Sequence, residues 1–465
     1  MFQIQYVSAP AGSGKTYELA RWATERVAAH EKIVIAQPTK KLMQETAKAI
    51  VGLDPNTTPT LFYSRSKRDN VTARIQAHFE GAAPHHGEVI IVSHEALSRL
   101  PDSHKKFWHL FVDEMPSVFS ASSLNIPKTH HLVTTSTRIA AELVSGIGVI
   151  EKASPLLETI ATSDDDGYRP FQQFARAVLD PNILVLADTD QFNDLIGNSK
   201  TTGKFYTYHI ERSNFVQGFG SVTMMSANFE DCELYHFWDR FENIQWAKHP
   251  IQHRIEAGAR FQGGVHKNGS RLSVRYLFDE DVGLEYLRGT NGTECPLDLI
   301  CELVEADYAG SSYLWHVNKD FQMATPLDHA GLLPMVSHGI NQPHFVATHN
   351  VAIISAFNYG SPACRFLKKL GFDDRQFRTM LNYQKDYQTM MRCSLRDPAA
   401  TRPVDLLVLS RGSAEYIAGK FPGCNVAKVE HEIAPPKRSG GQKKAEPKTR
   451  AEIQKAYRAR LKAAA

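Results

Sequence analysis

The chain has 465 residues, of which 42% are apolar and 22% charged, with a formal net charge of +3. This composition excludes a wholly disordered, collagen-like or disulfide-dense chain, and the length predicts about three domains. No apolar run approaches the roughly 18 residues of a membrane span, and the first residues lack a secretory signal, so we expect a cytoplasmic protein. The six cysteines form no zinc-binding pattern and are expected to be reduced.

The small net charge hides a strong asymmetry along the chain. Residues 436–465 contain ten Lys or Arg and two Glu, so this segment carries +8. The remaining body, with 43 basic and 48 acidic residues, is mildly acidic. We predict that residues 431–465 form a basic disordered tail with one short helix, which binds an anionic partner.

The first half of the chain alternates apolar strands with helical segments. A strand at 2–8, a Gly-rich turn and a helix at 15–31 come first, followed by a helix at 40–51. Further apolar strands are predicted at 33–36, 88–93, 109–113, 183–187 and 221–226. Strands that are apolar on both faces indicate a parallel sheet covered by helices, that is, an α/β fold. Residues 134–180 are predicted to be a helical insertion.

The alternation resumes after an aromatic-rich segment near residue 240. Strands are predicted at 311–317, 350–356 and 404–410, and a helix and a short strand near Val426 follow. We therefore predict one α/β domain at residues 1–235 and a second at 236–430.

A P-loop pattern lies between the first strand and the first helix. The sequence APAGSGKT at residues 9–16 has small residues that let backbone N–H groups surround phosphates, and the helix N-terminus favours an anion. Lys15 would contact the phosphates and Thr16 would bind Mg²⁺. The residues predicted to bind ATP are Pro10, Ala11, Gly12, Ser13, Gly14, Lys15 and Thr16.

An acidic pair closes the strand at 109–113. Asp113 is suited to bind Mg²⁺, and Glu114 is suited to polarise an attacking water. A base that activates water favours hydrolysis over transfer to a second substrate.

The order of motifs resembles that of superfamily 1 and 2 helicases. The matching segments are GSGKT (12–16), AQPTK (36–40), IIVSHEAL (90–97), VDEM (112–115), MSAN (225–228), LWHVNK (314–319), SHGIN (337–341) and YQTMMRCSLRD (387–397). The set looks most like superfamily 2-type helicases of bacteriophages and mobile elements. The resemblance implies two tandem RecA-like domains with ATP between them.

The resemblance also implies roles for residues outside the P-loop. Gln388, Arg392 and Arg396 are expected to act on the γ-phosphate, and their spacing of four places them on one face of a helix. Either arginine could be the finger that stabilises transition-state charge. Ser226 and Asn228 would couple hydrolysis to movement, although Asn228 replaces the Thr of the superfamily 2 motif. Backbone-directed, sequence-independent contacts with nucleic acid are expected at Thr39, Ser93, His94, Gly339 and Asn341.

We therefore predict an ATP- and Mg²⁺-dependent helicase or translocase that acts on nucleic acid, with DNA the expected substrate, in replication or recombination of a phage or mobile element. The host would then be bacterial, and no membrane partner is expected. The basic tail would bind nucleic acid or, as a second candidate, a replication protein. Two alternatives stay open: a viral DNA-packaging ATPase with a nuclease domain, and a DNA-binding loader that uses ATP as a switch without unwinding.

Overall fold

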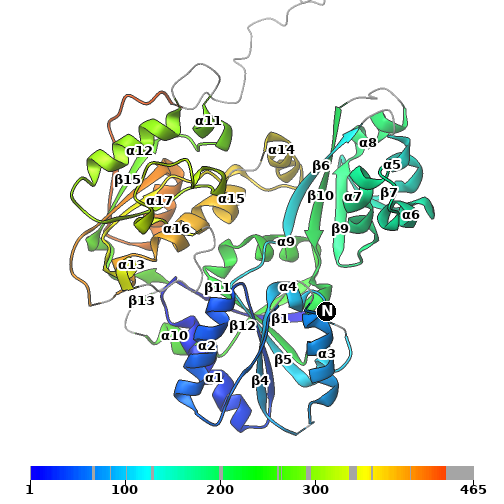
Figure 1. Ribbon diagram of the computed structural model, residues 1–465, viewed down its shortest axis with the longest axis horizontal. Coiled ribbons are helices and arrows are strands. Elements are labelled where there is room, and N and C mark those ends of the chain that lie inside the picture. Colours follow the sequence, from blue (N-terminus) through cyan, green and yellow to red (C-terminus); the bar gives the residue numbers. More distant parts are fainter. Residues whose placement is uncertain are drawn as a thin grey trace, which may run out of the picture.

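The structure is a computed structural model, and its described residues form an α/β protein with two parallel sheets and one antiparallel sheet (Figure 1). These residues are 2–64, 69–83, 85–100, 102–126, 130–197, 203–258, 261–262, 264–289, 295–334, 343–357, 360–397 and 399–435. The predicted α/β class is confirmed, and the two parallel sheets are consistent with tandem RecA-like domains. Residues 436–465 of the basic tail predicted at 431–465 lie outside the described residues.

The first unit contains a seven-stranded parallel sheet with the order β12-β1-β11-β5-β2-β4-β3. Its strands are β1 (Phe2–Ala9), β2 (Lys32–Gln37), β3 (Thr60–Phe62), β4 (Glu88–Ser93), β5 (Trp108–Asp113), β11 (Ser221–Ala227) and β12 (Ile244–Lys248). Ile33 and Ile35 pack on one face with α1 (Lys15–Ala28), α2 (Lys40–Leu53) and α10 (Ile251–Glu256). Val34 and Ala36 face the other side, which is covered by α3 (Val71–Gly81), α4 (His94–Leu97) and α9 (Glu233–Phe241). Burial on both faces explains the continuous apolar runs of these strands.

The first unit extends beyond the predicted boundary between residues 235 and 236. That boundary falls within α9, and β12 then pairs in parallel with β1, with Phe2 opposite Ile244. The chain therefore leaves the first sheet only after α10.

The predicted helical insertion at 134–180 is wrong in part, because the described residues between 119 and 211 form an antiparallel sheet with helices on it. Its order is β6-β10-β9-β8-β7, with strands β6 (Phe119–Ile126), β7 (Thr137–Val144), β8 (Ile147–Lys152), β9 (Ile183–Asp188) and β10 (Gly203–Glu211). The helices are α5 (His131–Ser136), α6 (Leu156–Thr162), α7 (Arg169–Leu179) and α8 (Thr189–Ile196). The strand predicted at 183–187 exists as β9, but it belongs to this sheet and not to the first parallel sheet.

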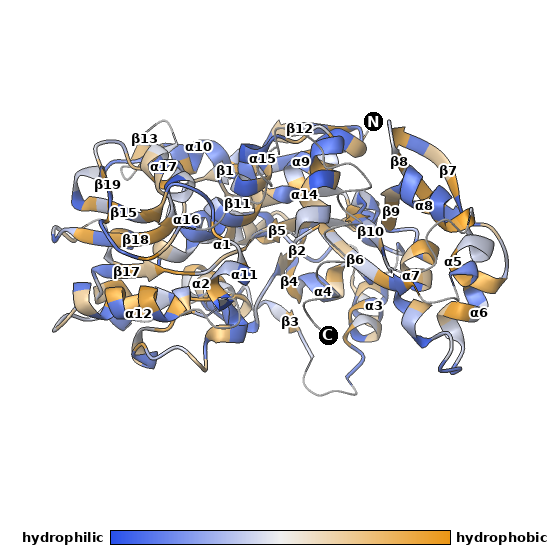
Figure 2. Cartoon of the chain, turned by 90° about the horizontal axis from the view of Figure 1, so that it is seen from above, coloured by the Kyte–Doolittle hydropathy of each residue, from blue (hydrophilic) through white to orange (hydrophobic). Residues whose placement is uncertain are grey.

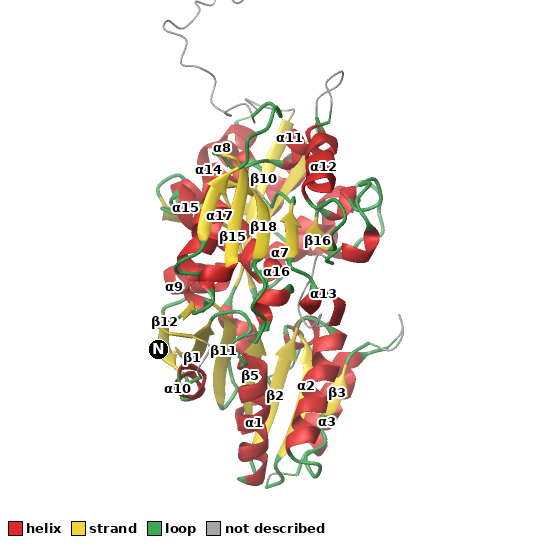
Figure 3. Ribbon diagram, turned by 90° about the vertical axis from the view of Figure 1, so that its left-hand side faces the viewer, coloured by secondary structure: helices red, strands yellow, loops and turns green. Residues whose placement is uncertain are grey.

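The second unit contains a five-stranded parallel sheet with the order β16-β17-β18-β15-β19. Its strands are β15 (Leu272–Phe278), β16 (Tyr313–His316), β17 (Asn350–Ile353), β18 (Val404–Ser410) and β19 (Asn425–Lys428). Helices α11 (Leu284–Arg288) and α12 (Pro296–Asp307) cover one face; α13 (Pro343–Ala347), α16 (Gln384–Met390) and α17 (Arg411–Lys420) cover the other. Figure 3 shows the two parallel sheets one above the other, with α16 at their junction.

The second unit also contacts the insertion. Helix α14 (Ser361–Lys369) places Phe366 flat against Tyr208 of β10, with ring centroids 3.6 Å apart, and Phe119 of β6 lies 6.1 Å from Phe366. Lys369 pairs with Asp188 at the edge of this contact. In Figure 2 the insertion lies at the opposite end of the molecule from β15, β18 and β19, and α14 lies between them.

Candidate nucleotide site

The loop at residues 10–14 joins β1 to the N-terminus of α1. Gly12 and Gly14 have φ values of 78° and 84°, which residues with a Cβ rarely adopt. The backbone N–H of Ser13 donates to the carbonyl of Pro10 (3.2 Å) and so tightens the loop. The Ser13 hydroxyl is buried and has no hydrogen-bond partner among the described residues. The loop thus has the backbone form expected of a phosphate cradle.

Lys15 lies inside this loop. Its Nζ donates to the carbonyls of Ala9 and Pro10, each at 3.0 Å. Burial lowers the pKa of Lys15, while the carboxylates of Glu114 and Asp113 act in the opposite direction. A buried ammonium group at this position suits an anionic ligand.

The predicted metal-binding residues meet at the ends of adjacent elements. The Thr16 hydroxyl donates to Oδ2 of Asp113 at 3.3 Å, and the same oxygen accepts from Nε2 of Gln37 at 2.8 Å. Burial raises the pKa of Asp113 to about 6, and the neighbouring Glu114 adds to this effect. Mg²⁺ prefers oxygen ligands such as a hydroxyl and a carboxylate. Thr16 and Asp113 therefore fit that ion. Gln37, which orients Asp113, was missed as an individual residue, although it lies in the motif at 36–40.

Glu114 is held in a strained backbone conformation. Its φ is 62°, in the left-handed region, and its N–H donates to the carbonyl of Met225 (2.8 Å). The hydroxyl of Ser226 lies 3.5 Å from Oε2 of Glu114. Strained conformations of this kind occur often at functional sites. The structure therefore brings Ser226, predicted as a coupling residue, to the predicted catalytic acid.

The second unit covers the loop with residues 384–396. A Cβ added at Gly12 would lie 3.6 Å from Cε of Met391 and 3.7 Å from Cγ of Arg396. Arg396 acts electrostatically on Lys15, and Glu114 acts on Arg392. Arg396 is thus close to the P-loop, and Arg392 lies within electrostatic range of Glu114.

The predicted helical face that carries Gln388, Arg392 and Arg396 is wrong. Helix α16 ends at Met390, so Arg392 lies in a turn and Arg396 in a short 3-10 helix. Among the described residues, α16 contacts the first unit through hydrogen bonds of Gln384 and Tyr387 and not of Gln388. Gln384 donates to the carbonyl of Ala227. Its position three residues before the matched motif gave no signal for this role.

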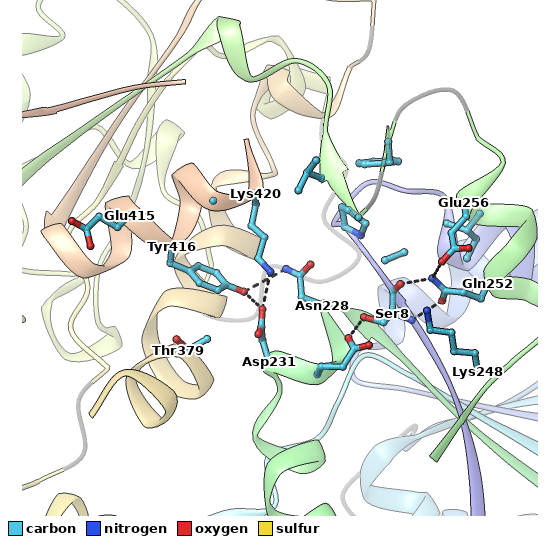
Figure 4. Close-up of a pocket in the computed structure, with 18 of the residues that line it drawn as sticks. Ser8, Asn228, Asp231, Lys248, Gln252, Glu256, Thr379, Glu415, Tyr416 and Lys420 are labelled. Carbon is cyan, nitrogen blue, oxygen red and sulfur yellow. Dashed lines mark hydrogen bonds and ion pairs between the residues drawn. The ribbon is translucent and has the colours of Figure 1, made fainter. Parts of the chain in front are cut away.

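Asn228, the second predicted coupling residue, faces the second unit. It has a φ of 46°, and its amide lies 3.4 Å from the hydroxyl of Tyr416. The same hydroxyl is 2.7 Å from both the Asp231 carboxylate and the Gln384 amide oxygen. Lys420 pairs with Asp231 at 2.9 Å (Figure 4). No pattern in the sequence pointed to Tyr416 or Lys420.

A cavity of about 880 Å³ opens beside the P-loop between the two units. Ala9 and Pro10 line it together with Lys248 and Gln252 of the first unit and Tyr416 of the second. The Gln252 side chain is bonded to both the N–H and the carbonyl of Ser8, so it fixes the end of β1. The cavity therefore adjoins the start of the P-loop.

The residues predicted to contact nucleic acid are brought together only in part. Ser93 ends β4, and Thr39 follows the end of the neighbouring strand β2 by two residues. Each hydroxyl caps the following helix. His94 Nε2 lies 3.2 Å from the carbonyl of Asp113. Gly339 and Asn341 fall outside the described residues.

No helix in the described part of the chain is long and apolar enough to span a membrane. No group of three or more His, Cys, Asp or Glu side chains in these ranges could hold a metal ion.

No protein-family model and no curated protein matches the chain. Among solved structures, S. cerevisiae Dbp5 bound to RNA and ADP BeF3 is 11% identical, with 92% of this chain and 85% of Dbp5 covered and a TM-score of 0.39. The DEAD-box helicase Mss116 bound to ssRNA and UDP-BeF is 10% identical, with 93% and 72% covered and a TM-score of 0.39. The E. coli DExH-box NTPase HrpB is 11% identical, with 89% and 40% covered and a TM-score of 0.36. These scores assign the chain to no family.

Proposed function

We propose that the chain is an ATP- and Mg²⁺-dependent helicase or translocase that acts on nucleic acid. One observation supports the proposal: Arg396 of the second unit approaches the P-loop of the first, and Arg392 of the second unit lies within electrostatic range of Glu114. Such a site is complete only when the two units are close. Hydrolysis at a junction of this kind can be coupled to relative movement of the units, as a translocase requires.

Each residue has a distinct role in this proposal. Lys15 and the loop N–H groups bind the phosphates, and Glu114 orients and deprotonates the attacking water. Thr16 and Asp113 would hold Mg²⁺, which neutralises phosphate charge when it is bound. Arg392 and Arg396 stabilise the charge that develops on the transferred phosphoryl group.

The nucleic acid would run along the edge of the first sheet where β2 and β4 end. Thr39, Ser93 and His94 lie there, and the motif resemblance adds Gly339 and Asn341 from the second unit. Hydroxyl and backbone contacts of this type grip the sugar-phosphate chain without selecting a sequence. The resemblance favours DNA as the polymer and a phage or mobile element as the setting.

The test is ATP hydrolysis by Lys15→Ala and Glu114→Gln with and without single-stranded DNA or RNA. We expect wild-type hydrolysis to be stimulated by nucleic acid and both variants to lose at least about 100-fold in kcat. Arg411→Ala is a matched control, because Arg411 is exposed on α17 and pairs with Glu415. Undiminished hydrolysis in both active-site variants would refute the assignment. Strand displacement on tailed duplexes then separates a helicase from an ATP-switched loader.

A further inference from the structure

Tyr387 connects the P-loop to the interior of the second unit. Its side chain is fully buried, and its hydroxyl accepts a hydrogen bond from the N–H of Ala11 at 2.8 Å. The same hydroxyl lies 2.7 Å from Nε2 of His266. One side chain of the second unit therefore contacts a backbone group of the first unit's phosphate loop.

The direction of these hydrogen bonds follows from the donors available. The N–H of Ala11 can only donate, so the Tyr387 hydroxyl accepts from it and keeps its own proton free for a second hydrogen bond. In the Nδ1–H tautomer of His266, Nε2 is unprotonated and accepts that proton. Burial lowers the pKa of His266 to about 3, and the positive charges of Lys15 and Lys420 act in the same direction, so the ring is neutral near pH 7.

The histidine is itself held in a fixed orientation. Phe421 stacks on its ring with centroids 4.0 Å apart and an interplanar angle of 4°, and Phe261 contacts it edge-on at 4.9 Å. His266 is only 4% exposed. The chain Ala11–Tyr387–His266 is thus anchored at its far end by packing within the second unit.

Ala11 is also enclosed sterically by the second unit. It packs against the apolar cluster that contains Met390 and Met391. The next residue, Gly12, is approached by Met391 and Arg396. The hydrogen bond to Tyr387 therefore fixes the turn whose following N–H groups would surround the phosphates.

We propose that Tyr387 is a positioning residue for the phosphate loop, supplied by the second unit and oriented by His266, and that it links nucleotide affinity to closure of the two units. This inference rests on the proposed nucleotide site. A contact that forms only when the units approach favours closure, and closure with the ordered loop favours the nucleotide, because coupling is reciprocal. Tyr387 and His266 thus act from outside the P-loop motif and do not touch the reacting atoms.

The experiment measures the Kd of a fluorescent ADP analogue, the KM and kcat for ATP, and the Tm of single and double variants. Tyr387→Phe removes only the hydroxyl and should raise Kd and KM by about three- to tenfold, the usual worth of one hydrogen bond. His266→Phe should give a similar rise. The double variant should be no weaker than Tyr387→Phe, because both changes break one chain.

Two further variants separate positioning from general stability. Tyr383→Phe, on the turn before α16, loses a hydroxyl that bonds Asp281 inside the second unit, so its Kd should stay within about twofold of wild type. His266→Gln keeps an acceptor and should restore part of the affinity lost in His266→Phe, even if Tyr387→Phe folds poorly.

The outcomes distinguish this inference from the proposed function. If the wild type binds ADP but Tyr387→Phe binds it equally well, or if the two single effects multiply in the double variant, the role of Tyr387 is refuted and the nucleotide site stands. If the wild type binds no nucleotide, both are overturned.

Discussion

The buried charge of Arg392 predicts a variant that is more stable than wild type and less active. Arg392 is 8% exposed, and its Nε has no hydrogen-bond partner among the described residues. Its pKa falls from the usual 12.5 to about 10, chiefly through burial and then through repulsion by Arg396. At 1.36 kcal/mol per pKa unit, keeping Arg392 charged lowers the free energy of unfolding by about 3 kcal/mol.

Arg392→Met removes the charge and keeps an apolar stem of similar length. A buried charge without a full set of partners can be replaced by an apolar side chain with a gain in stability. For units of about 200 residues, each kcal/mol raises the Tm by roughly 2–4 °C, so a rise of several degrees is expected. The same change removes a donor aimed at developing phosphoryl charge and should lower kcat by about 100- to 1000-fold.

The assay combines calorimetry in the absence of nucleotide with steady-state ATPase rates in the presence of single-stranded DNA. Arg396→Met is the informative comparison, because Arg396 is less buried and should gain less stability for a similar loss of rate. Arg411→Met controls for the loss of one positive charge on the surface. A Tm for Arg392→Met several degrees below wild type would mean that the guanidinium is well satisfied, and would refute the reasoning.

Two further predictions concern stability away from the nucleotide. Phe366→Ala removes the ring that α14 stacks on Tyr208 and should cost about 3–5 kcal/mol, seen as a lower Tm and faster proteolysis in the insertion, whereas Phe366→Leu should cost less. His249 and His316 are buried, and burial lowers the pKa of each to about 4, so the unfolded chain binds protons that the folded chain does not between pH 6.5 and 4. The contribution of the two neutral histidines to the free energy of unfolding is therefore complete above pH 6.5. It is lost as the pH falls towards 4, at about 1.4 kcal/mol per pH unit for each histidine. Urea midpoints at pH 7.5 and 5 should show this fall, and His316→Gln should reduce it.

The sheets that carry the P-loop could be predicted because burial on both faces leaves a local signal. The strands β2, β4 and β18 are apolar runs bounded by polar or glycine-containing turns, and APAGSGKT marks the turn after β1. Asp113 and Glu114 could be assigned to the same edge because parallel strands end together.

The insertion escaped prediction because its strands lack that signal. In β7, five of the eight residues are polar or alanine, and the strand is largely exposed. Pattern alone also cannot assign β9, whose apolar run suits a parallel sheet equally well. The second unit's β15 was missed for the same reason, since Ser273 and Arg275 interrupt its apolar residues. Pairing partners decide these cases, and they are set by contacts distant in the chain.

The arginine segment shows most directly how tertiary contacts override a local period. Spacing of four from Gln388 to Arg396 predicts one continuous helical face, and no Gly or Pro interrupts it. The helix nevertheless ends at Met390: the N–H groups of Arg392 and Cys393 donate to carbonyls three residues back, and the N–H of Ser394 donates to the carbonyl of Thr348 (2.9 Å), a residue from another part of the second unit. Tyr387 then faces the P-loop from the helix, Arg392 lies in the turn, and Arg396 approaches Gly12 from the 3-10 helix that follows. Had the helix continued, residues 388, 392 and 396 would share a face and Tyr387 would lie beside it. The early end of the helix therefore determines which side chains form the site.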